Sequence, residues 1–160
     1  MLILGLDPGS TRIGYGIIKK EENDLKLVAS GLLKISSKDK GQRLLEAEKS
    51  LSGILKKYSI DLAALEKLFF AKNLKTAIEV SQTRGVLTLL VVKHKIPLLE
   101  FSPSEVKIAA TGYGSADKRA VAKMVGRILK TDKISKVDDV SDALAIAITA
   151  ALNIKFIPHK

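Results

Sequence analysis

The sequence contains no cysteine and only two histidines. The absence of cysteine excludes a disulfide framework and a metal site built from thiolates. The sequence also lacks an apolar run near the ~18 residues that a membrane-spanning helix needs. Its longest run, residues 143–152, contains Thr149 and has no signal-peptide flanks. We therefore expect a cytoplasmic protein with no membrane partner.

Acidic residues are in the minority. The chain has 17 Asp and Glu against 27 Lys and Arg, which gives a formal net charge of +10. A basic surface could serve solubility alone. However, the basic residues are spread along the whole chain and form no tail, which favours a polyanionic partner such as nucleic acid.

The order of apolar segments predicts an α/β fold. Three early strands are joined by short links, so they should form an antiparallel meander. Two later strands each follow a helix, which is typical of parallel crossover strands. With 160 residues and no linker of low complexity, we expect one domain spanning residues 1–160, with a five-stranded mixed sheet flanked by helices. The expected strands are residues 2–6, 13–19, 25–35, 60–70 and 96–101, and the expected helices are residues 42–58, 73–92, a short helix after Ser102-Pro103, 116–130 (with Ser115 as its N-cap) and 139–152.

Three places in the chain carry acidic residues in apolar surroundings. Asp7 ends the first expected strand, and Glu66 interrupts the fourth. Asp138, Asp139 and Asp142 precede the buried run of the last helix. A first-turn acid is often a cap or a partner of the helix dipole, and Asp138 is best interpreted as an N-cap. Asp139 and Asp142 lie three residues apart, hence on one helical face.

Asp7, Glu66, Asp139 and Asp142 together predict a site of hard oxygen ligands. Such a site suits Mg²⁺ or Mn²⁺ rather than Zn²⁺. Two cations held by clustered carboxylates can stabilise both the attacking and the leaving oxygen of a phosphodiester. Each acid taken alone could equally be a cap or a surface charge, so the hypothesis depends on their convergence.

One expected helix, residues 73–92, carries small side chains at every fourth position. Ala77, Ser81 and Gly85 would allow another helix to approach closely. The approaching surface could be the protein's own sheet or a second copy of the chain, and the sequence leaves these two interpretations equal.

The chain resembles the RuvC family of Holliday-junction resolvases, which has an RNase H-like fold. The resemblance extends over essentially the whole sequence, and its motifs occur in the family's order and spacing. These motifs are Gly5-Leu-Asp7-Pro-Gly-Ser10 with Gly14-Tyr-Gly16, Glu66-Lys-Leu-Phe69-Phe-Ala-Lys-Asn73, Ser81-Gln-Thr-Arg-Gly85, residues 103–107, Gly114-Ser-Ala-Asp-Lys118, and Asp139-Val-Ser-Asp142-Ala-Leu-Ala.

The resemblance implies roles for individual residues. Asp7, Glu66, Asp139 and Asp142 match the family's metal-binding catalytic carboxylates. Lys107 and Lys118 match catalytic basic residues near the scissile phosphate, although each could be a surface lysine, and Lys118 could simply pair with Asp117. Phe69 matches an aromatic residue that stacks near the junction centre, and Asn73 lies in the same DNA-contacting segment.

The resemblance also implies a reaction and partners. The expected reaction is Mg²⁺-dependent hydrolysis, with Mn²⁺ able to substitute and two ions in each site, that leaves 5′-phosphate and 3′-hydroxyl ends. The expected substrate is four-way junction DNA, cut symmetrically by a homodimer during recombination and repair. The family also works with the RuvA–RuvB branch-migration complex.

Two other functions remain open at this stage. Gly5-x-Asp7-x-Gly9-Ser10 also resembles the first phosphate motif of actin-like and Hsp70-like ATPases, but that fold duplicates its domain and this chain has room for one copy. A non-catalytic junction-binding protein is the third hypothesis. It predicts that substitution of Asp7 removes no activity.

Overall fold

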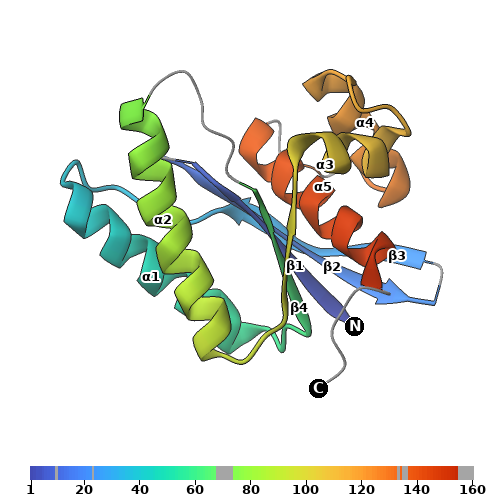
Figure 1. The fold of residues 1–160 in the computed structure, drawn as a ribbon. Helices are drawn as coiled ribbons and strands as arrows, with labels where there is room; N and C mark the ends of the chain where they lie inside the picture. The colour runs from blue at the N-terminus through green and yellow to red at the C-terminus, as the bar shows by residue number, and fades with distance from the viewer. Residues whose placement is uncertain (10, 23, 68–73, 133, 135–136, 155–160) are drawn as a thin grey trace.

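A computed structural model describes residues 1–9, 11–22, 24–67, 74–132, 134 and 137–154 of the chain. A five-stranded sheet with the order β3-β2-β1-β4-β5 lies at its centre. The sheet separates two layers of helices (Figure 1). The strands are β1 (Leu2–Pro8), β2 (Ile13–Glu21), β3 (Asp24–Leu32), β4 (Leu62–Glu66) and β5 (Leu98–Phe101), and the helices are α1 (Lys40–Lys57), α2 (Leu74–Lys93), α3 (Pro103–Thr111), α4 (Lys118–Ile128) and α5 (Asp138–Leu152).

Strand pairing follows from the connections. The short links make β1 antiparallel to β2 and β2 antiparallel to β3. The helical connections through α1 and α2 make β4 parallel to β1 and β5 parallel to β4. The predicted mixed sheet, three antiparallel strands followed by two crossover strands, is therefore confirmed.

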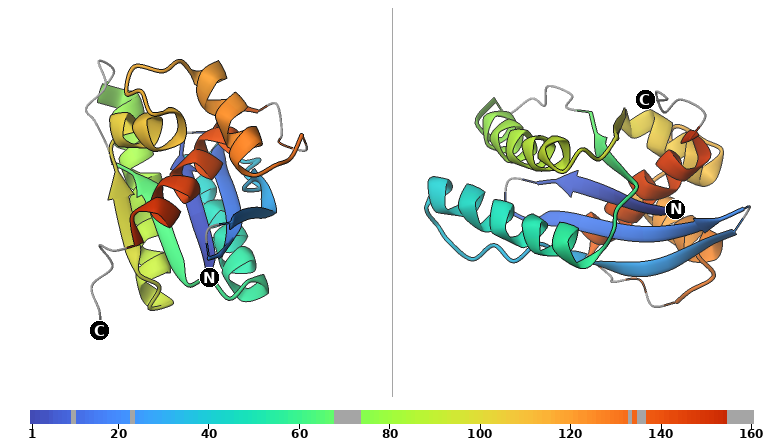
Figure 2. Two further views of the ribbon diagram at one scale, coloured as in Figure 1. Left: turned by 90° about the vertical axis from the view of Figure 1, so that its right-hand side faces the viewer. Right: turned by 90° about the horizontal axis from the view of Figure 1, so that it is seen from below.

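Successive side chains of β1 point alternately to the two faces of the sheet. Leu4 and Leu6 pack into the cluster beneath α1 and α2, whereas Ile3 packs into the cluster beneath α5. The two helical layers are seen from further directions in Figure 2. A strand whose successive side chains enter opposite cores must be central, as β1 is.

Helix α5 lies directly against β1 and β2 because glycines face it. A Cβ atom on Gly5 would lie 2.1 Å from the carbonyl oxygen of Ala143, and one on Gly14 would lie 1.8 Å from the carbonyl oxygen of Asp139. Any side chain at these positions would push the helix away from the sheet. The close approach explains why residues 143–151 are buried.

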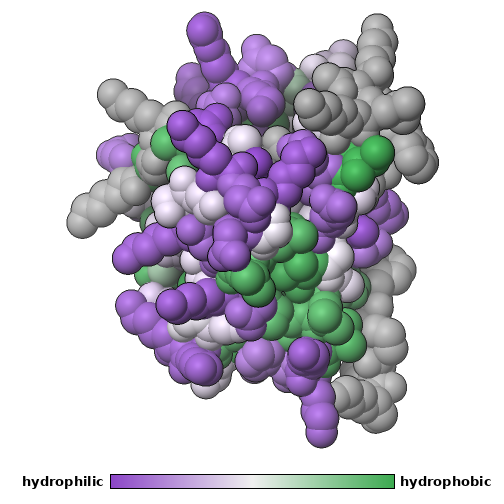
Figure 3. Space-filling model, turned by 90° about the vertical axis from the view of Figure 1, so that its left-hand side faces the viewer, coloured by the Kyte–Doolittle hydropathy of each residue, from purple (hydrophilic) through white to green (hydrophobic). Residues whose placement is uncertain are grey.

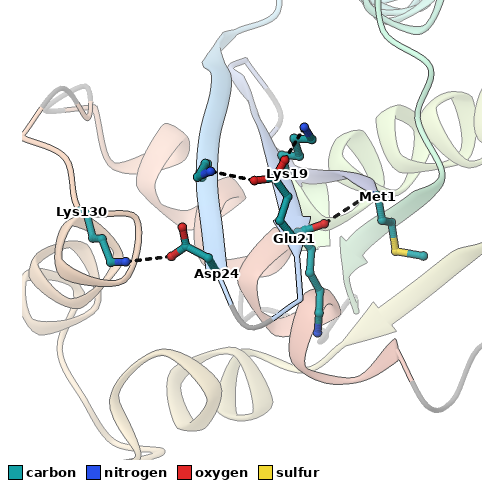
Figure 4. A network of polar contacts seen from close by, with 7 residues as sticks. Met1, Lys19, Glu21, Asp24 and Lys130 are labelled. Carbon is teal, nitrogen blue, oxygen red and sulfur yellow. Dashed lines mark hydrogen bonds and ion pairs between the residues drawn. The ribbon is translucent and has the colours of Figure 1, made fainter.

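Helix α4 packs on the outer side of α5, and its far end is tied to the sheet. Lys130, two residues after α4, pairs with Asp24 at the start of β3 with an Nζ–Oδ1 distance of 2.8 Å (Figure 4). In the same view, Glu21 pairs with Lys19 of its own strand, and it also pairs with Lys26 across the β2–β3 hairpin. The Lys130–Asp24 pair therefore joins the segment after α4 to the start of β3.

Small residues on α2 do not pack on the protein's own sheet. Ser81 and Gly85 are exposed, and a Cβ atom on Gly85 would meet nothing within 4 Å. Thr83, Leu87 and Val91 form the buried side of the helix instead. The interpretation that this small face contacts the sheet is therefore wrong.

No helix within the described ranges is both long enough and apolar enough to span a membrane.

Candidate active site

Two carboxylates lie side by side at the ends of neighbouring strands. Leu6 of β1 is paired with Leu65 of β4 in parallel register, so Asp7 and Glu66, which follow them, leave the sheet at the same edge. The carboxyl ends of parallel strands are a common place for functional side chains in α/β folds. The strand order alone thus brings together residues 59 positions apart.

Two further carboxylates come from the first turns of α5. Asp7 is paired with Gly14 across β1 and β2, and Gly14 contacts the backbone of Asp139. The glycine contact therefore places the N-terminus of α5 beside Asp7. Asp142 follows one turn later on the same face, as its spacing predicts.

The prediction that Asp138 caps α5 is wrong. Val137 occupies the N-cap position, no side chain caps the helix there, and Asp138 is the first helical residue. Its carboxylate still lies in the first turn, where the helix dipole favours negative charge. Its carbonyl oxygen accepts a hydrogen bond from Ser141 Oγ at 2.9 Å.

A cavity of about 330 Å³ opens between the strand ends and the helices. It combines acidic and basic side chains with an apolar wall. Asp139 lies beside this cavity rather than in its lining. The lining residues are Asp7, Glu66, Pro103, Val106, Lys107, Lys118, Val121, Asp142 and Ile146.

Burial and mutual repulsion disturb the acids of this cavity. The pKa of Asp7 is raised from 3.8 to about 7, first by burial and then by the charges of Asp142, Glu66 and Asp139. Burial also raises the pKa values of Glu66 and Asp142, with Asp142 adding to the effect on Glu66. Neutral forms are favoured because several like charges share a poorly hydrated space.

Lys118 enters the cavity and pairs with Asp142, not with Asp117. The Nζ–Oδ2 distance is 3.3 Å, and the charge of Asp142 raises the pKa of Lys118. Asp117 instead caps α4 by accepting a hydrogen bond from the backbone N–H of Ala120 at 2.7 Å. The prediction that Ser115 is the N-cap is therefore wrong, and α4 begins at Lys118.

Arg12 is a site residue that the sequence did not reveal. Its Nε lies 3.2 Å from Oδ2 of Asp139, and its side chain is 63% exposed. Oδ2 itself is buried and receives no hydrogen bond. Arg12 immediately precedes β2, so the pairing of that strand with β1 was the one available signal that it would lie near Asp7.

The donor set fits a hard divalent cation. All four predicted ligands are carboxylates. Three have raised pKa values, and the fourth, Asp139, has a buried Oδ2 that pairs with Arg12 but receives no hydrogen bond. Within the described ranges, no three acidic or histidine side chains converge closely enough to hold an ion as they stand. Arg12 and Lys118 draw Asp139 and Asp142 into ion pairs instead.

Lys107 lines the cavity from α3, so both predicted lysines border it. A capping box fixes the start of that helix. The Ser102 side chain accepts a hydrogen bond from the Glu105 N–H, and Glu105 Oε2 accepts one from the Ser102 N–H. Pro103 is the first residue of the helix, as predicted.

Phe69 and Asn73 lie outside the described residues, so their predicted DNA contacts stay predictions.

Known proteins resemble this chain over most of its length. A family model described as crossover junction endodeoxyribonuclease RuvC matches residues 3–150. The crossover junction endodeoxyribonuclease RuvC of Petrotoga mobilis is 42% identical over 148 residues, which are 92% of this chain and 91% of the relative.

Solved structures share the architecture. RuvC of T. thermophilus in complex with a Holliday junction substrate has a TM-score of 0.89 at 28% identity, covering 97% of this chain and 95% of that one. The yeast mitochondrial Holliday junction resolvase Ydc2 has a TM-score of 0.65 at 16% identity, covering 92% and 77%, which shows a shared fold. The predicted RNase H-like fold is thereby confirmed.

Proposed function

Because the chain belongs to the RuvC family of crossover junction endodeoxyribonucleases, we propose that it resolves four-way DNA junctions by metal-dependent hydrolysis of two strands. The observation that carries this proposal is the cavity where acids with raised pKa values meet Lys107 and Lys118 on a chain of net charge +10. The acids suit a cation, and the surrounding basic charge suits the phosphate backbone.

Asp7, Glu66, Asp139 and Asp142 would hold the cation, Mg²⁺ by preference and Mn²⁺ as a substitute, with two ions in each site. When bound, the ions supply charge stabilisation for the attacking and leaving oxygens. Deprotonated carboxylates are the binding form, so loading releases a proton from Asp7 near neutral pH. Burial keeps bulk water away from the ligand oxygens and strengthens their interactions.

Lys107 and Lys118 orient the scissile phosphate. Both ammonium groups border the cavity, and each can donate to a non-bridging phosphate oxygen. To reach the substrate, the ammonium group of Lys118 would have to leave Asp142, which would itself be one of the residues that hold the cation.

The reaction is hydrolysis without a covalent enzyme intermediate. A water oxygen forms a bond to phosphorus, the bond from phosphorus to the 3′ oxygen breaks, and the 3′ oxygen takes up a proton. The products are a 5′-phosphate and a 3′-hydroxyl. Among the described residues that line the cavity, acids and lysines are the polar side chains, which suits attack by a water molecule.

A homodimer is the proposed active form. Ile78, Leu89 and Val92 on α2 are 59%, 55% and 59% exposed, and they share a side of the helix with Ser81 and Gly85. Figure 3 views the side of the molecule that carries α1 and α2 and shows a connected hydrophobic area there. A two-fold dimer through this surface would present two sites to a substrate of approximate two-fold symmetry. Cooperation with the RuvA–RuvB complex stays a prediction from the family.

A cleavage assay tests the function. A labelled four-way junction and a linear duplex are incubated with the protein, with and without Mg²⁺, and the series is repeated with Asp7→Asn. We expect paired, metal-dependent nicks in the junction that disappear in the variant while junction binding persists. Equal cutting of linear duplex would contradict junction selectivity. Unchanged activity in the variant would contradict the assigned site, and ATP hydrolysis without nicking would favour the ATPase hypothesis.

A further inference from the structure

One exposed side of α4 carries a row of basic residues. Arg119, Lys123 and Arg127 are spaced four residues apart, and all three side chains are exposed. Val121 and Val125 form the opposite, buried side of the same helix. Four-residue spacing places side chains one above another along a helix, so the three form a continuous basic row.

This basic row has no acidic partner among the residues that the structure describes. Lys118 pairs with Asp142 and Lys130 with Asp24, which removes both from consideration. Asp132 lines the same hollow of about 540 Å³ as Lys123 and Arg127, yet it makes no ion pair with either of them. Helix α4 itself contains no acid, whereas α1 combines its lysines with Glu46 and Glu48.

A solvated basic surface normally gains from interspersed acids, because like charges four residues apart repel each other. On α4 no acid offsets the repulsion between the three basic side chains, although an acid could be accommodated at any of their three exposed positions. The pattern is better explained by a ligand that supplies the negative charge.

The helix that carries the row begins at the proposed active site and leads away from it. Lys118, the first residue of α4, lines the catalytic cavity. From Arg119 to Arg127 the helix advances eight residues, or about 12 Å at 1.5 Å each. That length corresponds to roughly three to four base pairs of duplex at 3.4 Å per step.

The position of α4 also suits a duplex that leaves the junction. In Figure 1, α4 lies beyond α5, on the opposite side of the molecule from α2. In a dimer joined through α2, the two basic rows would therefore lie at the outer ends of the assembly. A junction arm that extends away from the two-fold axis would pass the catalytic cavity and then α4.

We propose that Arg119, Lys123 and Arg127 bind the phosphate backbone of the duplex arm adjacent to the cleavage point. This inference rests on the proposed function and adds an extended arm-binding surface to the catalytic cavity. The contacts are to phosphates, so they hold the arm in register with the cavity and carry no base sequence preference.

The test compares two triple variants. Arg119→Gln, Lys123→Gln and Arg127→Gln together remove the basic row. Lys49→Gln, Lys56→Gln and Lys95→Gln remove the same charge from exposed lysines on α1 and after α2. Junction affinity is measured over a series of salt concentrations. Ca²⁺ replaces Mg²⁺ in these measurements so that binding is followed separately from cutting. Circular dichroism and thermal unfolding check that both variants fold.

We expect the row variant to bind the junction roughly 10- to 100-fold more weakly at low salt, and its slope of log K against log salt to be smaller by about 3. The control variant should keep the wild-type affinity and slope. The change in the row variant should fall on affinity more than on the rate of cutting at saturating junction.

Equal slopes for the two variants, or equal losses in both, would overturn the arm-binding role and leave only a general effect of net charge. Failure of the wild-type protein to bind or cut the junction would instead refute the proposed function. The two failures are therefore distinguishable.

Discussion

At the scale of single residues, Asp7 sets the charge balance of the site. Its pKa of about 7 means that the folded protein holds about half a proton there at neutral pH and close to one proton at mildly acidic pH. The unfolded chain would release that proton near pH 4, since an ordinary aspartate has a pKa of about 3.9. Folding therefore binds a proton that the unfolded chain would lose, and stability must depend on pH.

The sign of that dependence gives the first prediction. A raised carboxyl pKa contributes stability that is fully present below about pH 4 and is lost as pH rises through about 7. Above pH 7 the buried charge costs up to about 4 kcal/mol, an upper bound from the pKa difference. Asp7→Asn should thus raise the Tm of the metal-free protein by several degrees at pH 8 and change it little at pH 4, as measured by thermal unfolding in a chelator.

Two controls sharpen this comparison. Asp132→Asn alters an exposed acid outside the cavity and should leave the pH profile unchanged. Mg²⁺ should raise the Tm of the wild-type protein at pH 8 and have little effect on Asp7→Asn, because only the binding-competent folded state gains from the ion. A variant that is less stable than the wild type at pH 8 would contradict the assignment of Asp7 as a strained, buried charge.

The second prediction concerns Arg12. In the proposed metal site its guanidinium would compete with the cation for Asp139, but its 63% exposure limits the strength of that ion pair to about 1 kcal/mol or less. Arg12→Gln should therefore bind Mg²⁺ two- to fivefold more tightly, as measured by calorimetry, with Arg119→Gln, which also changes an exposed arginine, as the comparison. Weaker Mg²⁺ binding would show that Arg12 orients Asp139 for the ion.

The sequence predicted which acidic residues form the site better than it predicted which basic residues pair with them. Asp7, Glu66 and Asp142 stood out because each carboxylate interrupts or borders an apolar segment, and the structure places all three around one cavity. Arg12 could not be found in that way, because an arginine in a turn is indistinguishable from any solvated cation until the neighbouring helix is placed.

At the scale of elements, the contact between α5 and the sheet decides the geometry of the site. The N-terminus of α5 carries Asp139 and Asp142, whereas Asp7 belongs to β1. Gly14 is the spacer between these elements, since its Cα faces the Asp139 carbonyl with no room for a methyl group. Packing at one glycine therefore controls the distance between the carboxylates of Asp7 and Asp139, which come from two parts of the chain.

The third prediction follows from that contact. Gly14→Ala should destabilise the protein by about 1–3 kcal/mol or more, because the added methyl must displace a helix backbone rather than a flexible side chain. It should also lower the affinity for Mg²⁺ and the cleavage rate, since Asp139 moves with the helix. Denaturant unfolding and the junction assay measure these effects.

Gly53→Ala is the matched control. A Cβ atom at Gly53 in α1 meets nothing within 4 Å, so the same substitution should stabilise that helix by about 0.5–1 kcal/mol. Equal effects of the two alanines on stability would contradict the spacer role of Gly14.

The order and type of the elements were predictable, whereas several ends were not. Apolar patterning and link length predicted the order and type of the strands. The cap of α4 was misplaced because Ser115 and Asp117 are both good N-cap residues, and the burial of Ala116 between them became visible only in the folded chain. Tertiary packing thus chose between two local signals of similar strength.

At the scale of the whole molecule, the exposed side of α2 stands out because it carries large apolar side chains that are more than half exposed. Its apolar side chains remain in water although the buried side of the same helix is complete. The sequence left open what the small residues contact, because both a sheet and a second helix favour close approach. Ser81 and Gly85 do not face the sheet, so the proposed dimer contact is the interpretation that remains to be tested.

The last prediction tests that contact. Leu89→Glu places a charge within the apolar side of α2, and burying it in a dimer would cost about 2 kcal/mol or more, or roughly a 30-fold loss in dimer affinity. Sedimentation should show the wild type as a dimer at micromolar concentration and the variant as a monomer. Leu152→Glu, at a residue that is 59% exposed on α5, should leave the dimer intact.

The monomeric Leu89→Glu variant should cut one strand of a junction at a time instead of making paired nicks, since each copy carries one proposed catalytic cavity. Paired nicking by a stable monomer would show that symmetric resolution does not depend on α2.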